Sequence, residues 1–190
     1  MPLPPHYLIT PAVDNETEFL AGLEHSLQAG IKLLQFKNKN MSTADYLTLA
    51  KKLLAIAHAY DCRVLLTSSP EEVAQLGADG LHIDSQSLTN YPSRPLPEPY
   101  LIAASCHSAD ALRKAQNIEA SFALISPVKQ TNSHPDLAPL GWEGFSVLTN
   151  QFILPIFALG GVSPDDEDDA INAGGQGIAS TRGYWKPNEL

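Results

Sequence analysis

The sequence predicts an α/β fold, a compact (β/α)8 or TIM barrel whose last helix is short or missing. Short runs of apolar and β-branched residues alternate with amphipathic stretches along the whole chain, and eight such runs can be counted. Nearly continuous apolar strands are typical of a parallel sheet covered by helices, and eight strands close a barrel. An open, doubly wound sheet is the rival interpretation. The length of 190 residues fits one domain.

The predicted strands are short and separated by turn residues or helical patterns. They are expected at 6–10, 31–36, 63–66, 81–83, 100–106, 122–128, 155–159 and 177–181. The helices between them are expected at 18–29, 42–60, 69–77, 109–117, from about 142 onward, and at 163–175. Only residues 183–190 follow the last strand, which is why the eighth helix is expected to be short or missing.

Capping residues support these helix boundaries. Ser69 and Glu72 form a capping box around Pro70, and Gly77 ends that helix. Ser163 and Pro164 open the helix after strand seven in the same way. The segment 89–99 holds four of the 15 prolines, so it is expected to be a loop that crosses the barrel bottom.

Charge and composition restrict the partners. The formal net charge of −9 leaves no basic surface for a nucleic-acid backbone or an anionic membrane, so neither is an expected partner. No apolar run approaches the ~20 residues that cross a bilayer. Cys62 and Cys106 are the two cysteines, and no leader sequence precedes the first strand, so a cytoplasmic location is expected.

The active site of such a barrel lies at the C-terminal ends of the strands, where the apolar runs turn polar. Gln35, Lys37 and Lys39 alternate at the end of strand two, which places them on one face; the alternative is that the lysines belong to a solvated loop. The other polar residues at strand ends are Thr67, Ser68, His82, Asp84, Ser105, Cys106, His107, Ser126, Lys129, Thr131, Ser133, His134, Thr181 and Arg182.

Two segments indicate a phosphorylated ligand. Gly160 and Gly161 end strand seven just before a helix start, where the backbone can approach an anion closely. The segment from Gly177 through Thr181 to Arg182 follows, and phosphate sites after strands seven and eight recur in barrels. We therefore expect these residues to line one phosphate pocket. The structural alternative is that Arg182 forms an ion pair with a carboxylate elsewhere.

The sequence resembles the thiamin phosphate synthase and thiazole tautomerase superfamily over nearly its whole length. The segments that carry the resemblance are 35–39 (QFKNK), 77–82 (GADGLH), 105–108 (SCHS), 126–128 (SPV) and 158–161 (ALGG). Segments 104–107, 126–142 and 182–185 more particularly resemble the synthase-like domain that follows a Nudix hydrolase domain in some bacterial proteins.

The resemblance implies a diphosphate held by magnesium and by an arginine and a lysine on strand two, and Lys37 and Lys39 stand at those two positions. The synthases' magnesium ligands are two acidic residues and an asparagine, and their positions resemble Thr67, Ser68 and Ser87. Asp84 could partly substitute for them. Magnesium prefers carboxylate anchors, so no metal site is predicted, and magnesium is a cofactor implied by resemblance only.

The tautomerases use an acid–base histidine at the exit of strand six, and Pro127 stands there. His107 and His134 are the candidate catalytic residues that could reach the same cavity. His107 could instead help to cap the next helix through Ser108, and His134 could be exposed. His82 lies in an apolar strand, where a satisfied core histidine is the commoner case.

Two hypotheses follow. The first is an enzyme, a transferase or isomerase, that acts on a phosphorylated thiamin precursor and uses Gln35, Lys37, Lys39, Ser105, Thr131, Ser133, Gly160, Gly161 and Arg182 to bind it. The second is a binding or accessory domain without catalysis. The expected partner is a small phosphorylated ligand, and the candidate protein partners are a second copy of the chain and a Nudix hydrolase.

Overall fold

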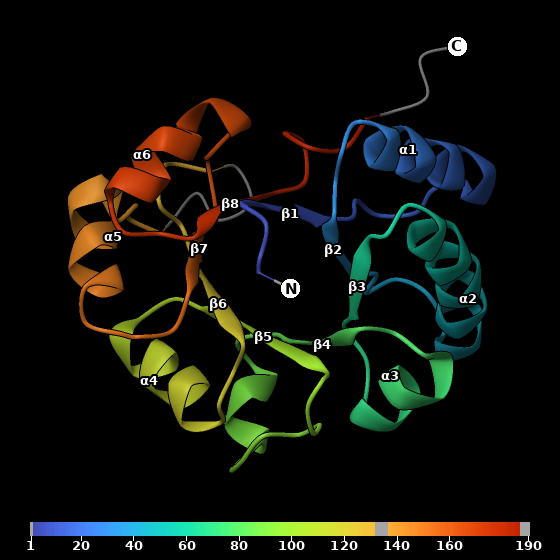
Figure 1. Cartoon of the computed structure of the whole chain (residues 1–190), viewed down its shortest axis with the longest axis horizontal. Helices are drawn as coiled ribbons and strands as arrows, with labels where there is room; N and C mark the ends of the chain where they lie inside the picture. The colour runs from blue at the N-terminus through green and yellow to red at the C-terminus, as the bar shows by residue number, and fades with distance from the viewer. Residues whose placement is uncertain (1, 132–136, 187–190) are drawn as a thin grey trace.

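The computed structural model describes residues 2–131 and 137–186, and it confirms a closed barrel of eight parallel strands within them (Figure 1). Each strand pairs with the next in chain order, and the last pairs with the first. The strands are β1 His6–Ile9, β2 Leu33–Phe36, β3 Arg63–Leu66, β4 Gly80–Ile83, β5 Leu101–Cys106, β6 Phe122–Ile125, β7 Ile156–Ala158 and β8 Gly177–Ser180.

Helices surround the barrel in Figure 1. They are α1 Glu16–Gln28, α2 Thr43–Ala59, α3 Pro70–Leu76, α4 Ala109–Asn117, α5 Gly141–Thr149 and α6 Glu167–Asn172, with 3-10 turns η1 Ser87–Asn90 and η2 Pro164–Asp166. The predicted capping box of α3 is present, and Gly77 ends that helix in the left-handed conformation. Because these signals are local, the sequence placed most helices within a few residues.

Among the described residues, no α-helix directly follows β4 or β8, and irregular segments cover the barrel at these two places. Between β4 and β5 the chain forms η1 and then a proline-rich segment with Leu96 buried. This segment is not confined to the barrel bottom as expected, because the chain must return along the outside of the barrel to the start of the next parallel strand. After β8, Tyr184 is buried and Trp185 stacks on Phe19 of α1, with ring centroids 5.0 Å apart. These two aromatic residues take the place of an eighth helix.

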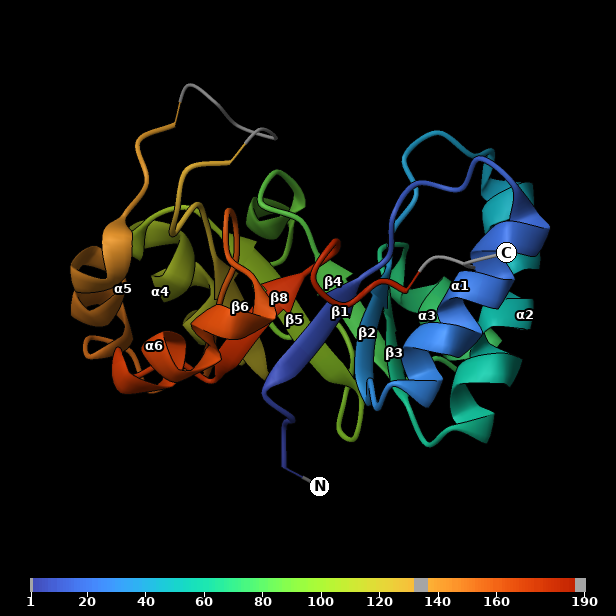
Figure 2. The ribbon, with the colours of Figure 1, turned by 90° about the horizontal axis from the view of Figure 1, so that it is seen from above.

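The barrel interior is apolar in its middle and at its lower end. Tyr7 packs edge-on against Phe122, with ring centroids 5.2 Å apart, and Phe157 completes the aromatic group. Leu3 packs against the same cluster, so the N-terminal segment closes the lower end, which Figure 2 shows below the strands. Apart from the buried His82 and the Tyr7 hydroxyl, which contact each other, the polar inward-facing residues lie toward the upper, C-terminal end.

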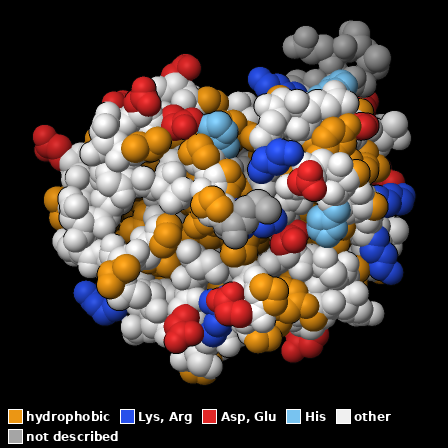
Figure 3. Space-filling view, viewed as in Figure 1, with side chains coloured by type: hydrophobic (Ala, Val, Ile, Leu, Met, Phe, Trp, Pro, Cys, Tyr) orange, Lys and Arg blue, Asp and Glu red, His pale blue; other side chains and the backbone are white. Residues whose placement is uncertain are grey.

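The closed N-terminal face is the one seen in Figure 3. Basic and acidic side chains are interspersed over it, and hydrophobic side chains lie around its centre.

In the described ranges, no helix combines the length and the apolar character needed to cross a bilayer.

Candidate functional site

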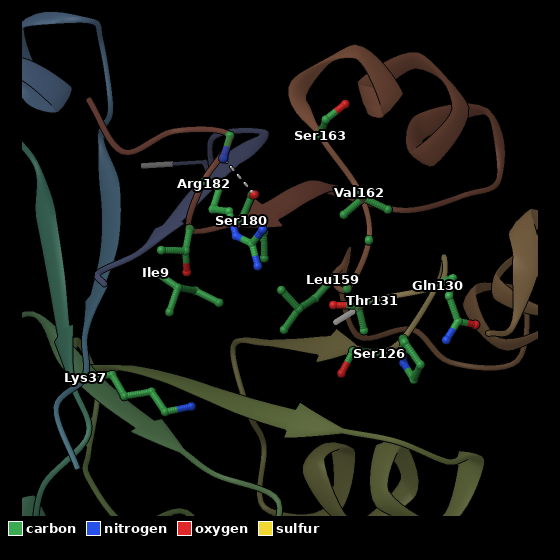
Figure 4. Close-up of a pocket in the computed structure, with 16 residues that line it drawn as sticks. Ile9, Lys37, Ser126, Gln130, Thr131, Leu159, Val162, Ser163, Ser180 and Arg182 are labelled. Carbon is green, nitrogen blue, oxygen red and sulfur yellow. Dashed lines mark hydrogen bonds between the residues drawn. The ribbon is translucent and has the colours of Figure 1, made fainter. Parts of the chain in front are cut away.

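A pocket of about 610 Å³ lies where β6, β7 and β8 end, and Figure 4 shows it. β1 and the segment after β2 complete its wall. Its lining residues are Ile9, Lys37, Ser126, Pro127, Gln130, Thr131, Leu159 to Ser163 and Ala179 to Gly183. The structure thus brings together six residues of the predicted set: Lys37, Thr131, Gly160, Gly161, Thr181 and Arg182.

The described lining of this pocket contains two cations and no carboxylate, although the chain as a whole is acidic. Arg182 is exposed, and it forms no ion pair within the described ranges. The alternative prediction, an ion pair between Arg182 and a carboxylate of the chain, therefore has no support among the described residues. In Figure 4 the side chains of Arg182 and Lys37 reach toward the same space from opposite walls. Such an arrangement favours an anion.

The glycine pair is required by the fold of its own loop. Gly160 and Gly161 have φ of +86° and +70°, and a Cβ on Gly160 would lie 2.9 Å from Pro127 Cα. Their backbone N–H groups donate no hydrogen bond to a described residue. The pair therefore lines the pocket with two backbone donors that no described residue accepts from, while the loop packs against the segment after β6.

The helix start that follows is not a free anion site, contrary to the prediction. Ser163 N donates to Asp166 Oδ2 at 2.9 Å, and Lys129 Nζ donates to Asp166 Oδ1 at 2.5 Å. Burial works to raise the pKa of Asp166, but the hydrogen bonds from Lys129 and Ser163 outweigh it and hold that pKa below its usual value. The chain's own carboxylate thus occupies the position that an anionic ligand would take.

The prediction for Gly177 is wrong. This glycine begins β8, so it lies at the end of the barrel opposite to the pocket. A Cβ there would sit 2.0 Å from the carbonyl oxygen of Pro5. The position requires glycine because the N-terminal segment approaches closely.

Polar side chains form the wall between β2 and β5. Gln35 is 2% exposed, and its Nε2 donates to Thr67 Oγ1 at 2.8 Å. This hydrogen bond connects the end of β2 with the residue that follows β3. Lys37 reaches the pocket, whereas Lys39 is exposed. Burial, and then the charge of Lys39, lowers the pKa of Lys37, and Asp84 opposes this shift.

Ser105 ends a buried hydrogen-bonded row. Tyr7 Oη lies 2.9 Å from His82 Nδ1, and His82 Nε2 lies 2.8 Å from Ser105 Oγ. Tyr7 is fully buried and His82 is 2% exposed, whereas Ser105 is partly exposed at the end of β5. Both ring nitrogens of His82 thus have a hydrogen-bond partner, which agrees with the interpretation of His82 as a core histidine. The histidine also connects the core with the barrel mouth.

His107 lies beside the pocket. Its Nδ1 donates to the carbonyl oxygen of Ser126, a lining residue, at 2.8 Å. The cap of α4 comes from Ser108, the residue after His107, which accepts from Ala111 N. Ser133 and His134 lie outside the described residues.

A second, smaller hollow of about 180 Å³ lies where β3 and β4 end. Thr67, Ser68, Asp84, Ser87 and Tyr91 line it, together with Leu81 to Ile83. Ser68 Oγ is buried without a hydrogen-bond partner among the described residues. The sequence pattern does not indicate Tyr91 in this hollow, or Ile9 and Leu159 in the larger pocket, because apolar or loop residues carry no signal of a ligand site.

A family model described as thiamine monophosphate synthase matches residues 6–183. The chain belongs to the thiamine monophosphate synthase family. The thiamine-phosphate synthase of Fusobacterium nucleatum is 26% identical over 179 residues, which cover 93% of this chain and 87% of the relative. That of Clostridium acetobutylicum is 25% identical over 186 residues, which cover 97% and 88%. The thiamine phosphate pyrophosphorylase of Pyrococcus furiosus has the same fold, with a TM-score of 0.74 and 21% identity over 93% of this chain and 84% of that one.

The residues of this family member do not fit a magnesium ion at the positions that the resemblance implies. Thr67, Ser68 and Ser87 offer hydroxyls, and Asp84 is the carboxylate among them. Asp84 Oδ1 already accepts from Ser87 N at 2.8 Å. Burial opposes ionisation of Asp84, but Ser87, Lys39 and Lys37 together keep its pKa below the usual value. Two ammonium groups therefore balance this carboxylate, and the described residues hold no group of three histidine, cysteine, aspartate or glutamate side chains that could bind a metal ion.

Proposed function

We propose that this barrel binds a phosphorylated ligand of the thiamin-precursor type, with the phosphate group in the pocket between Lys37 and Arg182. The observation that carries the proposal is the pocket's lining: two cations, the free N–H groups of Gly160 and Gly161, and no carboxylate among the described residues. A guanidinium can hold two phosphate oxygens at once, and backbone N–H groups can hold the third. The family's description supports the ligand class.

The proposed activity is transfer or isomerisation of that ligand without magnesium. His107 is the candidate group for proton transfer, because its ring lies against Ser126 at the pocket rim. With the Nδ1 hydrogen given to the Ser126 carbonyl, Nε2 is the nitrogen that can accept a proton. Lys37 and Arg182 would hold phosphate charge during the reaction.

Phosphate binding is the first test. We expect Arg182→Met to weaken the binding of inorganic phosphate, measured by calorimetry, by about tenfold or more, because a charged hydrogen bond is lost. Arg113→Met is the matched control, since Arg113 is an exposed arginine of α4 paired with Asp110. The thermal midpoint should be nearly unchanged in both variants. Equal phosphate affinity in the wild type and Arg182→Met would refute the assignment.

A second candidate is a ligand-binding domain without catalysis that works with a Nudix hydrolase. The mismatch between the β3–β4 hollow and magnesium favours it, because synthase chemistry on a diphosphate normally needs that charge balanced. Incubating purified protein with the aminopyrimidine diphosphate and thiazole phosphate separates the two. Product that disappears in His107→Asn supports catalysis, whereas phosphate binding without product supports the second candidate.

A further inference from the structure

The row formed by Tyr7, His82 and Ser105 can carry its hydrogens in two ways. A neutral imidazole has one N–H, so one ring nitrogen donates and the other accepts. In the first arrangement Tyr7 donates to Nδ1, and Nε2–H donates to Ser105. In the second, Nδ1–H donates to Tyr7, and Ser105 donates to Nε2. The two hydrogen bonds, 2.9 and 2.8 Å long, are present in both.

The hydroxyl hydrogen that is left over decides between them. In the second arrangement the hydrogen of Tyr7 has no acceptor, because His82 is the tyrosine's one hydrogen-bond partner among the described residues and Phe122 and Phe157 pack around its ring. A buried donor without a partner is costly. In the first arrangement the hydrogen of Ser105 is left over, and Ser105 is partly exposed at the barrel mouth, where a ligand or water can accept it.

We propose that Tyr7 and His82 are positioning residues that fix the hydroxyl of Ser105 as a hydrogen-bond donor toward the ligand. The ligand would then place an acceptor there, such as an unprotonated ring nitrogen or a carbonyl oxygen. This second statement rests on the proposed function, whereas the direction of the hydrogen bonds does not. The same direction means that His82 donates to Ser105, so it does not activate this serine as a nucleophile.

The surroundings keep the row neutral. Burial, and then the charge of Lys37, lowers the pKa of His82 to about 3, and Asp84 offsets this in part. Burial raises the pKa of Tyr7 well above its usual value. Lys37 after β2 and Asp84 after β4 are the charged groups that act on the histidine, and they have opposite signs. The direction of the row is therefore expected to be constant across the neutral range.

Nitrogen NMR of the full chain with labelled histidine tests the direction. We expect Nδ1 of His82 without a hydrogen and Nε2 with one, unchanged between about pH 5 and 9. Tyr7→Phe should bring in the Nδ1–H form, because the donor to Nδ1 is gone. Tyr184→Phe is the matched control, since the Tyr184 hydroxyl is buried without a partner among the described residues. A hydrogen on Nδ1 in the wild type would overturn the proposal.

Binding of thiamine monophosphate and of inorganic phosphate, measured in parallel, tests the ligand. Ser105→Ala should weaken thiamine monophosphate by about tenfold and Tyr7→Phe by a few-fold, with phosphate affinity unchanged in both. If phosphate binds and Ser105→Ala has no effect on thiamine monophosphate, Ser105 is not a ligand donor and the proposed function stands. If neither compound binds the wild type, the proposed function fails, and the NMR result still decides the direction of the row.

Discussion

A side chain on Gly161 would collide with Gln130, because a Cβ at position 161 would lie 2.3 Å from the Gln130 carbonyl oxygen. Gly77 has the same φ of +70° and nothing within 4 Å of its Cβ position. An alanine at either position would therefore adopt the same unfavourable backbone conformation. Only at position 161 would its Cβ also collide with a neighbouring residue.

We expect Gly77→Ala to lower the free energy of unfolding by about 1–2 kcal/mol, the cost of the left-handed conformation. Gly161→Ala should lower it by about 1–3 kcal/mol more, because backbone must move. Urea unfolding of both variants measures the difference. Equal losses would mean that the loop after β6 yields without cost, and a side chain at 161 could then be used to probe the phosphate pocket.

The second prediction concerns magnesium. We expect Mg²⁺ and EDTA to leave the affinities for inorganic phosphate and diphosphate the same within about twofold, since the donor set offers one carboxylate. Asp84→Asn should strengthen diphosphate binding by about two- to fivefold, because a negative charge near Lys37 and Lys39 is removed. Calorimetry with and without the metal checks both. A large gain with Mg²⁺ that Asp84→Asn abolishes would show that Asp84 is a metal ligand.

The third prediction concerns the segment between β4 and β5. Arg94, 15% exposed, donates to the carbonyl oxygens of Leu96 and Tyr100 at 2.9 and 2.6 Å and also to that of Glu119. Arg94→Met should lower the free energy of unfolding by about 2–4 kcal/mol, because these acceptors lose a charged donor. Arg113→Met, at the exposed pair on α4, should cost less than about 1 kcal/mol. Comparable losses in chemical denaturation would show that the segment does not depend on Arg94.

The fourth prediction concerns pH. The hydrogen bonds at Asp166 lower its pKa in the folded chain, so its contribution to stability is present above the unfolded value of about 4 and is lost as the pH falls through the folded value. Asp166→Asn should cost about 1 kcal/mol at pH 7, as for a lost cap, and less at pH 3. Thermal unfolding across this range measures the difference, with the exposed neighbour Asp165→Asn as control. A cost that is constant with pH would contradict the prediction.

The helix capping signals were sufficient for α3 because every group involved lies within a few residues. Ser69 accepts from Glu72 N, and Glu72 accepts from Ser69 N, which the sequence shows directly. The same kind of local signal at Ser163 predicts a free anion site, and this prediction is wrong. Ser163 also begins a helical segment, but Asp166, held by Lys129 from the loop after β6, closes it to an anion.

The sequence by itself determined the barrel and most of its helices, since strand periodicity, caps and the strand count are properties of neighbouring residues. It also placed Lys37, Gly160, Gly161 and Arg182 at strand ends that meet in one pocket. Only the tertiary structure decided that Gly177 faces Pro5 at the other end of the barrel, and that His82 joins Tyr7 to Ser105. These contacts join residues far apart in the chain. Closure of the barrel fixes their separation, and no local pattern encodes it.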